Sequence, residues 1–288
     1  MKCPECSNNQ KVKDGMKCSQ CGYSFTFNPK EYATSGMTDG KFMACLRAAS
    51  QNNTKWFTEN QLYAALCRRR AKSIFPSFIA DLFKPKTRPD YLTELLRRWE
   101  SGGKKMENWI PKPSLHEPPP EWSEPDIYDY GVERILVVER DILVDWFVKN
   151  GVHAEQRMLV LAESGYPQYL LPVARRLLEE QPNLPVFLLH DATAQGSGMK
   201  DRLLAGGLLP LEGRQVTDLG MFPTDFRQLK QTRYFDPDDT QRALPVDAMM
   251  LPFFAMGLEM AMAEQMTFET MMAEQQRGGV HDLHSNFG

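Results

Sequence analysis

The sequence predicts an α/β domain with a parallel sheet, preceded by a small metal-binding module and a basic helical module. Three observations support this order. After residue 130, short apolar runs alternate with amphipathic stretches, which is typical of parallel strands covered by helices. Two Cys-x-x-Cys pairs open the chain, and a proline-rich stretch separates its halves. The 288 residues, 42% of them hydrophobic, are enough for about two folded units.

Charge divides the chain more strongly than its net value of −3 suggests. Residues 1–105 contain 19 lysines and arginines against 9 acidic residues, or +10, and the remaining 183 residues contain 15 against 28, or −13. A basic first half favours nucleic-acid binding, although two solvated domains can also differ in charge by drift. No apolar stretch is long enough for a membrane span, and the polar start lacks a signal peptide's apolar run, so we expect a cytoplasmic protein.

Four cysteines near the amino terminus have the spacing of a structural zinc site. Cys3 and Cys6 form one pair and Cys18 and Cys21 the other, with eleven residues between the pairs. Because a two-residue gap lets both sulfurs of a pair face one point, two pairs can complete a tetrahedral thiolate shell around Zn²⁺. We predict a zinc ribbon over residues 1–30 whose folding depends on the metal and whose closed shell excludes catalysis there.

The other residues of this region have simpler expected roles. Gly22 suits the left-handed turn that follows the second pair, and residues 23–27 are expected to form a short strand. Cys45 and Cys67 lie in apolar helical surroundings, so we expect core thiols rather than metal ligands.

A basic, winged-helix-like domain is predicted over residues 39–105. Apolar spacing indicates helices over 41–49, 59–70 and 90–100, with Thr58 capping the second, while no wing is visible in the sequence. Cations at the end of the second helix either contact DNA phosphates or offset the helix dipole. The expected DNA-binding residues are Arg68, Arg69, Arg70, Lys72, Lys84, Lys86 and Arg88.

Three further segments complete the predicted organisation. Six prolines indicate an extended linker over residues 109–128. Residues 243–277 form a Met-rich helical segment, whose methionines suit either a core or an adaptable partner surface. The tail, residues 278–288, has no apolar period and is expected to be disordered.

The α/β domain is predicted over residues 130–240. Its expected strands are 134–139, 157–162 and 185–191, and its helices are 143–149, 171–180 and 196–205. Glu139 and Asp191 follow two of the strands, so both belong to the edge where chemistry gathers in parallel sheets, and their oxygens could share a divalent cation. Glu139 could instead cap the following helix, and His190 is either a structural residue, a general base or a metal ligand.

The motifs ILVVE, LAESGYP and VFLLHD resemble, in this order, a Toprim domain, in particular that of topoisomerase VI A subunits and related meiotic double-strand-break proteins. The segment LGMFPTD, residues 219–225, matches a further motif of that family, and the resemblance covers about residues 130–235. It implies Mg²⁺ at Glu139 and Asp191, DNA as substrate, a catalytic tyrosine in the stretch that contains Tyr63, a homodimer and an ATPase partner subunit.

Two departures from that family concern catalysis. Ala64 stands where the attacking tyrosine is expected, and the stretch after Asp191 offers one carboxylate where the family has two, unless Asp201 turns inward. We therefore expect a DNA-binding protein with degenerate strand cleavage that acts within a larger complex. The alternatives are an active Mg²⁺-dependent nuclease that uses Glu139 and Asp191, and a zinc-ribbon adaptor that binds proteins.

Overall fold

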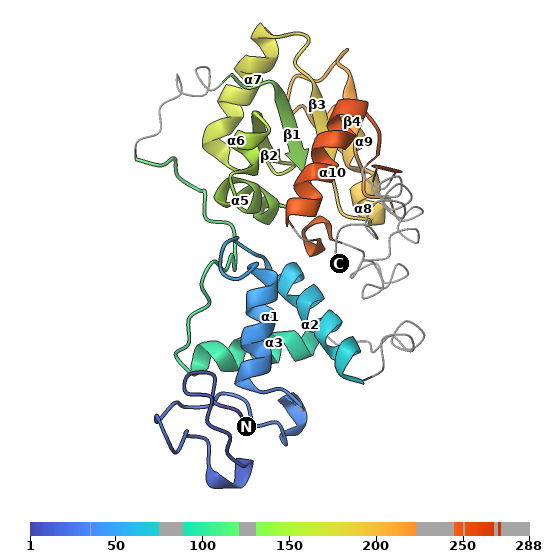
Figure 1. The fold of residues 1–288 in the computed structure, drawn as a ribbon. Coiled ribbons are helices and arrows are strands. Elements are labelled where there is room, and N and C mark those ends of the chain that lie inside the picture. The colour runs from blue at the N-terminus through green and yellow to red at the C-terminus, as the bar shows by residue number, and fades with distance from the viewer. Residues whose placement is uncertain are drawn as a thin grey trace, which may run out of the picture. The chain divides into compact units, whose positions relative to one another are not determined.

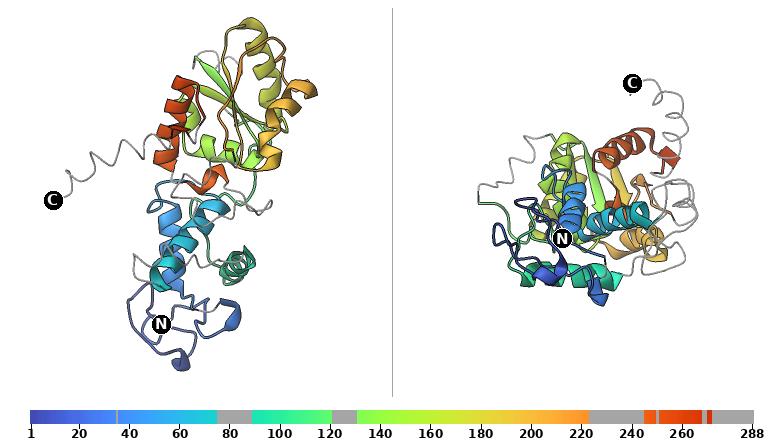
Figure 2. Two further views of the ribbon diagram at one scale, coloured as in Figure 1. Left: turned by 90° about the vertical axis from the view of Figure 1, so that its right-hand side faces the viewer. Right: turned by 60° about the horizontal axis from the view of Figure 1, so that its bottom comes forward.

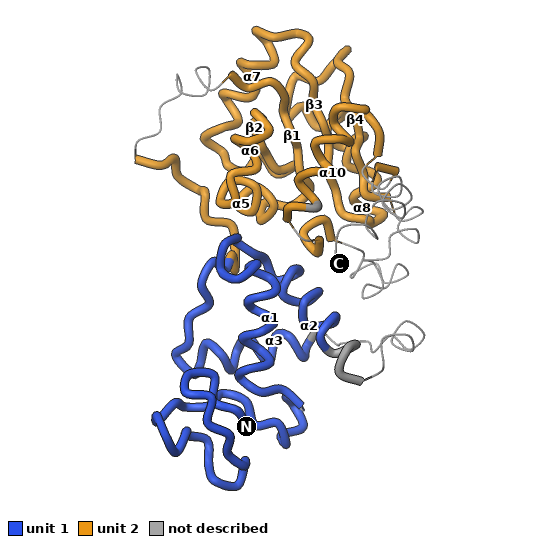
Figure 3. Tube along the Cα trace, in the orientation of Figure 1, with its two compact units in different colours: residues 1–109 blue, residues 110–288 orange. Residues whose placement is uncertain are grey.

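The computed structural model describes residues 1–34, 36–74, 89–120, 131–222, 245–249, 251–267 and 270–271, with the backbone alone at 70–74, 89 and 253. The chain forms two compact units, residues 1–109 and 110–288 (Figure 3). Within the described ranges, no helix is long and apolar enough to cross a membrane. The predicted tail, residues 278–288, lies outside these ranges.

Unit 1, residues 1–109, combines a cysteine-rich segment, residues 1–27, with three α-helices among its described residues (Figure 1). The helices are α1 (Asp39–Ala49), α2 (Glu59–Ile74) and α3 (Pro89–Ser101), so the three predicted helices are present and each is slightly longer than expected. Their core includes Phe27, Phe42 and Trp99, whose ring centroids lie 4.9 to 5.9 Å apart. Since the described part of unit 1 contains isolated β-bridges but no hairpin that would serve as a wing, the winged-helix prediction is not confirmed.

Two predictions on single residues of unit 1 have clear outcomes. The strand expected over residues 23–27 is wrong: this segment makes one isolated bridge, between Lys17 and Ser24, because the N–H groups of Thr26 and Phe27 donate to a side chain instead of to another strand. The core role of Cys45 and Cys67 is confirmed, since each is 1% exposed. Burial raises the pKa of Cys45 to about 11.

Unit 2, residues 110–288, contains a four-stranded parallel sheet in the order β2-β1-β3-β4. The strands are β1 (Arg134–Val138), β2 (Met158–Ala162), β3 (Val186–Leu189) and β4 (Val216–Asp218). The predicted parallel α/β fold is therefore confirmed. The strand β4 was missed because its three residues, Val-Thr-Asp, contain a single apolar side chain and give no recognisable run.

Helices cover both faces of this sheet. The described helices between β1 and β4 are α5 (Asp141–Lys149), α6 (Val152–Glu155), α7 (Leu171–Glu180), α8 (Ala194–Ser197) and α9 (Met199–Gly206). Apolar residues of α7 and α9 pack with Ile135 and Val137 on one face. The opposite face carries α5 and α10 (Leu251–Glu264), which meet through Trp146 and Phe254 (Figure 2). The helical segment predicted over 196–205 is present, but a turn at Gly198 divides it into α8 and α9.

The Met-rich segment is partly core and partly surface. It comprises the short helix η6 (Val246–Ala248) and α10. Met249 and Met262 are buried, whereas Met256 is 48% and Met260 39% exposed. The core role is therefore confirmed for Met249 and Met262, and a partner surface at Met256 and Met260 stays a prediction.

The first part of the predicted linker lies against the sheet domain of unit 2. Ser114 donates from its backbone N and its Oγ to Asp145 Oδ1, at 2.9 and 2.5 Å. Tyr166 Oη accepts from the backbone N of Leu115 and donates to Asp145 Oδ2, both at 2.5 Å. Residues 114 and 115 thus belong to unit 2, while residues 121–128 of the predicted linker lie outside the described ranges.

Candidate metal centre and carboxylate cluster

Four cysteine sulfurs of unit 1 converge on one point. The Sγ atoms of Cys3, Cys6, Cys18 and Cys21 all lie within 4.8 Å of one another. The separation is 3.6 Å between Cys3 and Cys21 and 3.5 Å between Cys6 and Cys18. Bonds of about 2.3 Å to one tetrahedral ion would separate the sulfurs by about 3.8 Å. The four predicted ligands are therefore brought together in an arrangement that fits a metal ion.

The two cysteine pairs have matching backbone turns. Ser7 N donates to Cys3 O at 3.1 Å, and Gly22 N donates to Cys18 O at 2.9 Å. Both donor residues have a left-handed backbone conformation, with φ of 61° at Ser7 and 77° at Gly22. The predicted turn at Gly22 is thus confirmed, and Ser7 is its unpredicted counterpart, since a non-glycine residue gives no sequence signal for positive φ.

The sulfurs influence each other's ionisation. The backbone N–H of Cys21 lowers the pKa of Cys18 to about 6, which favours a thiolate there. The backbone N–H of Tyr23 lowers the pKa of Cys21, but desolvation and the other three sulfurs outweigh it and raise that pKa to about 12. One thiolate therefore opposes the ionisation of its neighbours, and a bound cation would remove that opposition.

A buried aspartate fastens the cysteine-rich segment to α1. Asp39 is 1% exposed and accepts hydrogen bonds from Thr26 N, Phe27 N and Tyr23 Oη at 2.8 to 3.1 Å. Lys104 Nζ forms an ion pair with the same carboxylate. Desolvation and Asp39 together raise the pKa of Tyr23. Sequence reasoning missed this role because an aspartate in the first turn of a helix already has a local explanation.

The predicted DNA-binding cations are only partly described. Arg69 is exposed on α2, and Arg68 is half-buried. The side chains of Arg70 and Lys72 are not described, and Lys84, Lys86 and Arg88 lie outside the described residues. On the cysteine-rich segment, four lysines are exposed: Lys2, Lys11, Lys13 and Lys17.

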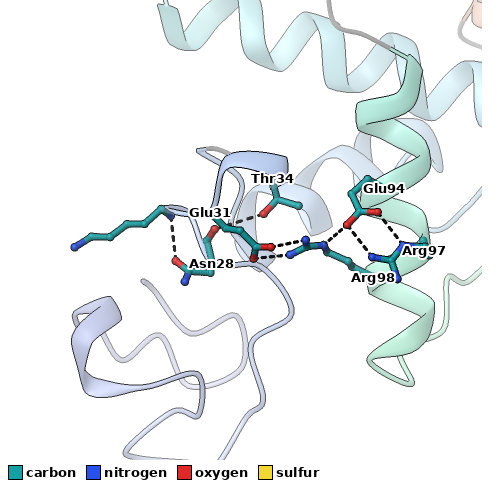
Figure 4. A network of polar contacts seen from close by, with 7 residues as sticks. Asn28, Glu31, Thr34, Glu94, Arg97 and Arg98 are labelled. Carbon is teal, nitrogen blue, oxygen red and sulfur yellow. Dashed lines mark hydrogen bonds and ion pairs between the residues drawn. The ribbon is translucent and has the colours of Figure 1, made fainter.

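Two other arginines of unit 1 are paired within the molecule (Figure 4). Arg98 contacts Glu31 through two bonds of 2.6 and 2.5 Å, and Arg97 contacts Glu94 through two bonds of 2.8 Å. Arg97 and then Arg98 hold the pKa of Glu94 down to about 2. This network joins α3 to the loop that precedes α1.

The predicted catalytic tyrosine lies in the helical core of unit 1. Tyr63 is half-buried on α2 and packs against the apolar cluster that includes Leu62 and Leu66. The next residue, Ala64, is 1% exposed. Tyr63 belongs to unit 1, whereas Glu139 and Asp191 belong to unit 2.

Glu139 and Asp191 do meet at the carboxyl edge of the sheet. Because β1 and β3 pair directly, Glu139 Oε2 accepts a hydrogen bond of 2.8 Å from Asp191 N. Both oxygens of Asp191 bond to the guanidinium of Arg140, with Nε to Oδ2 at 2.6 Å and Nη2 to Oδ1 at 3.1 Å. Desolvation raises the pKa of Glu139. Among the described residues, only the four cysteines have three or more ligand atoms placed for one metal ion.

A histidine and a further aspartate complete this edge. His190 is fully buried, with Nδ1 2.9 Å from Asp191 O and Nε2 3.2 Å from Oδ1 of Asp218, at the end of β4. Burial lowers the pKa of His190, but Asp218 outweighs it and raises that pKa. Asp218 was not predicted as a site residue because its strand, β4, was not predicted. Asp201 is exposed on α9 rather than turned inward.

No protein-family model matches this chain, and comparisons with curated proteins and with solved structures find no match. The fold and the cysteine cluster define an α/β protein with a four-stranded parallel sheet and a four-thiol centre that fits a metal ion.

Proposed function

We propose that the chain is a zinc-containing, DNA-binding protein in which unit 1 contacts DNA. The charge division carries this proposal, since residues 1–105 carry +10 and the rest −13. Zinc is the proposed ion because a closed set of four thiolates suits Zn²⁺ in a structural site. The exposure of the lysines on the cysteine-rich segment and of Arg69 supports the proposal, because surface cations can neutralise phosphates.

Unit 2 is proposed to be a Toprim-like domain with degenerate strand cleavage. The parallel sheet and the adjacent Glu139 and Asp191 support the resemblance. Degenerate cleavage is supported by Ala64 at the expected position of the nucleophile and by the single carboxylate of the Asp191-Ala192-Thr193 stretch. As in the A subunits that it resembles, the chain would act as a homodimer with an ATPase partner.

DNA binding is tested by fluorescence anisotropy with a labelled duplex over a series of salt concentrations. We expect affinity to fall steeply with salt, and we expect the change of Arg68 and Arg69 to alanine to reduce the salt slope by about 0.9 for each phosphate that the protein no longer neutralises. Arg175→Ala with Arg176→Ala is the matched control, because these two arginines are adjacent and exposed on α7 of unit 2. Absence of salt-dependent binding would favour the protein-binding adaptor.

Cleavage is tested on supercoiled plasmid with Mg²⁺ or Mn²⁺, followed by denaturation to reveal protein-linked DNA. We expect intact plasmid with both the natural protein and Glu139→Gln. Nicks that disappear in Glu139→Gln would establish the nuclease alternative, and a covalent adduct that disappears in Tyr63→Phe would establish tyrosine-dependent cleavage.

A further inference from the structure

Five carboxylates lie along the carboxyl edge of the sheet and the segments next to it, and three of them are paired with an arginine. Glu163 pairs with Arg202 at 2.6 Å, and Asp218 lies 3.2 Å from His190. The other two paired carboxylates, Asp191 and Asp247, share Arg140. Glu139 accepts the backbone N–H of Asp191 instead.

Arg140 bridges two buried carboxylates that are far apart in the sequence. Its Nη2 lies 2.6 Å from Asp247 Oδ1, in addition to the two bonds that it makes with Asp191. Asp247 is fully buried and Asp191 is 7% exposed. Two carboxylates this deeply buried require compensation by positive charge, because desolvation otherwise makes their ionised forms very unfavourable.

The same contacts hold residues 245–249 against the sheet. Asp247 lies in η6, directly before α10, and the neighbouring Val246 N donates to Asp191 Oδ1 at 2.8 Å. A planar guanidinium suits this position, because its fork binds one carboxylate through two N–H groups and still presents a donor to a second.

We propose that Arg140 is the resident cation of this edge and occupies the place between Asp191 and Asp247 that a divalent cation would otherwise take. The natural protein then binds no divalent cation there, and its two aspartates become a cation site only when the guanidinium is removed. Carboxylate oxygens from two segments are the ligands that Mg²⁺ and Ca²⁺ prefer. This inference goes beyond DNA binding and stands without it, because it rests on the charges and distances of unit 2 alone.

The experiment replaces the lost positive charge by a divalent cation in the full-length chain, with zinc bound at the four cysteines. In Arg140→Ala two buried carboxylates lose the guanidinium that they share, so we expect the thermal unfolding midpoint of unit 2 to fall by about 10 °C and hydrogen exchange over residues 245–249 to accelerate by about 100-fold. Millimolar Ca²⁺ or Mg²⁺ should reverse at least half of both changes. The natural protein should show no shift with either ion.

Two further variants separate this prediction from general destabilisation. Arg140→Ala combined with Asp191→Asn should not respond to Ca²⁺, because half of the cation site is gone. Arg202→Ala, which removes a guanidinium from the partly exposed Glu163, should shift the midpoint by no more than about 2 °C and show no Ca²⁺ response.

Two results would overturn the proposal. One is a folded Arg140→Ala protein that Ca²⁺ and Mg²⁺ do not stabilise. The other is calorimetric binding of either ion to the natural protein that disappears in Asp191→Asn, and this second measurement decides the question even if Arg140→Ala does not fold.

Discussion

Both units hold an irregular segment against a helix through a buried aspartate, but the two aspartates have different partners. In unit 1, Asp39 binds backbone N–H groups, Tyr23 and the charged Lys104. In unit 2, Asp145 binds uncharged donors of Ser114 and Tyr166.

The difference follows from the apolar surface that each segment can bury. The cysteine-rich segment has a small core of its own around Cys3, Cys18 and Phe25, so we expect its fold to depend on a metal ion at the four cysteines and on the ion pair of Asp39. The segment around Ser114 lies on a domain whose sheet core is already complete, and neutral hydrogen bonds are enough to hold it.

The largest expected difference between the two units is their response to removal of the metal ion. Because metal binding supplies about 10 to 16 kcal/mol in small zinc-dependent modules, chelation should abolish hydrogen-exchange protection over residues 1–27 and leave β1 and β3 protected. Cys18→Ser should have the same effect and reduce the metal content from one ion per chain to none. Cys45→Ala, a control at a buried cysteine outside the cluster, should keep the ion; absence of the ion in that variant would contradict the ligand assignment.

Asp39→Asn should weaken unit 1 by about 3 kcal/mol, because the neutral amide leaves Lys104 without its ion pair and presents an N–H₂ group to backbone donors. Denaturant unfolding followed by the fluorescence of Trp99 and its neighbours would measure this destabilisation. The metal content should stay at one ion per chain. A change below about 0.5 kcal/mol would show that the metal alone holds the cysteine-rich segment.

Asp145→Asn should have a smaller effect, about 2 kcal/mol, since no charged partner is left uncompensated. Proteolysis within residues 110–117 should become faster, while protection of the sheet changes little. Comparison with Tyr166→Phe and with the double variant would give the coupling between the two side chains. Additive effects would mean that the hydrogen bond between Asp145 and Tyr166 does not hold this segment.

The smallest expected effect is a pH dependence of unit 2 through His153 on α6. Burial lowers the pKa of His153, and the backbone of Phe147 offsets only part of that change. Below a pH of about 6.5 the unfolded chain takes up the proton first, so the free energy of unfolding should fall as the pH drops through this window. His153→Gln should flatten this slope, whereas His116→Gln, at an exposed histidine of the same unit, should leave it unchanged.

Features that depend on neighbours in the sequence were predictable. The spacing of Cys3, Cys6, Cys18 and Cys21 alone indicated their convergence, because each pair closes through one local turn. Apolar runs such as residues 134–138 indicated parallel strands, because burial on both faces requires continuous hydrophobicity. The ends of these strands in turn placed Glu139 beside Asp191.

Only the tertiary structure determined the polar pairs between residues that are far apart in the sequence. Asp39 reaches Lys104 across 65 residues, and Arg140 reaches Asp247 across 107. Within its own segment, an acidic residue in a first helical turn or an arginine beside a strand has an ordinary explanation as a cap or a solvated charge. Apolar periodicity reports the structure of one segment, whereas the partner of a buried charge is fixed by which distant segments the topology brings together.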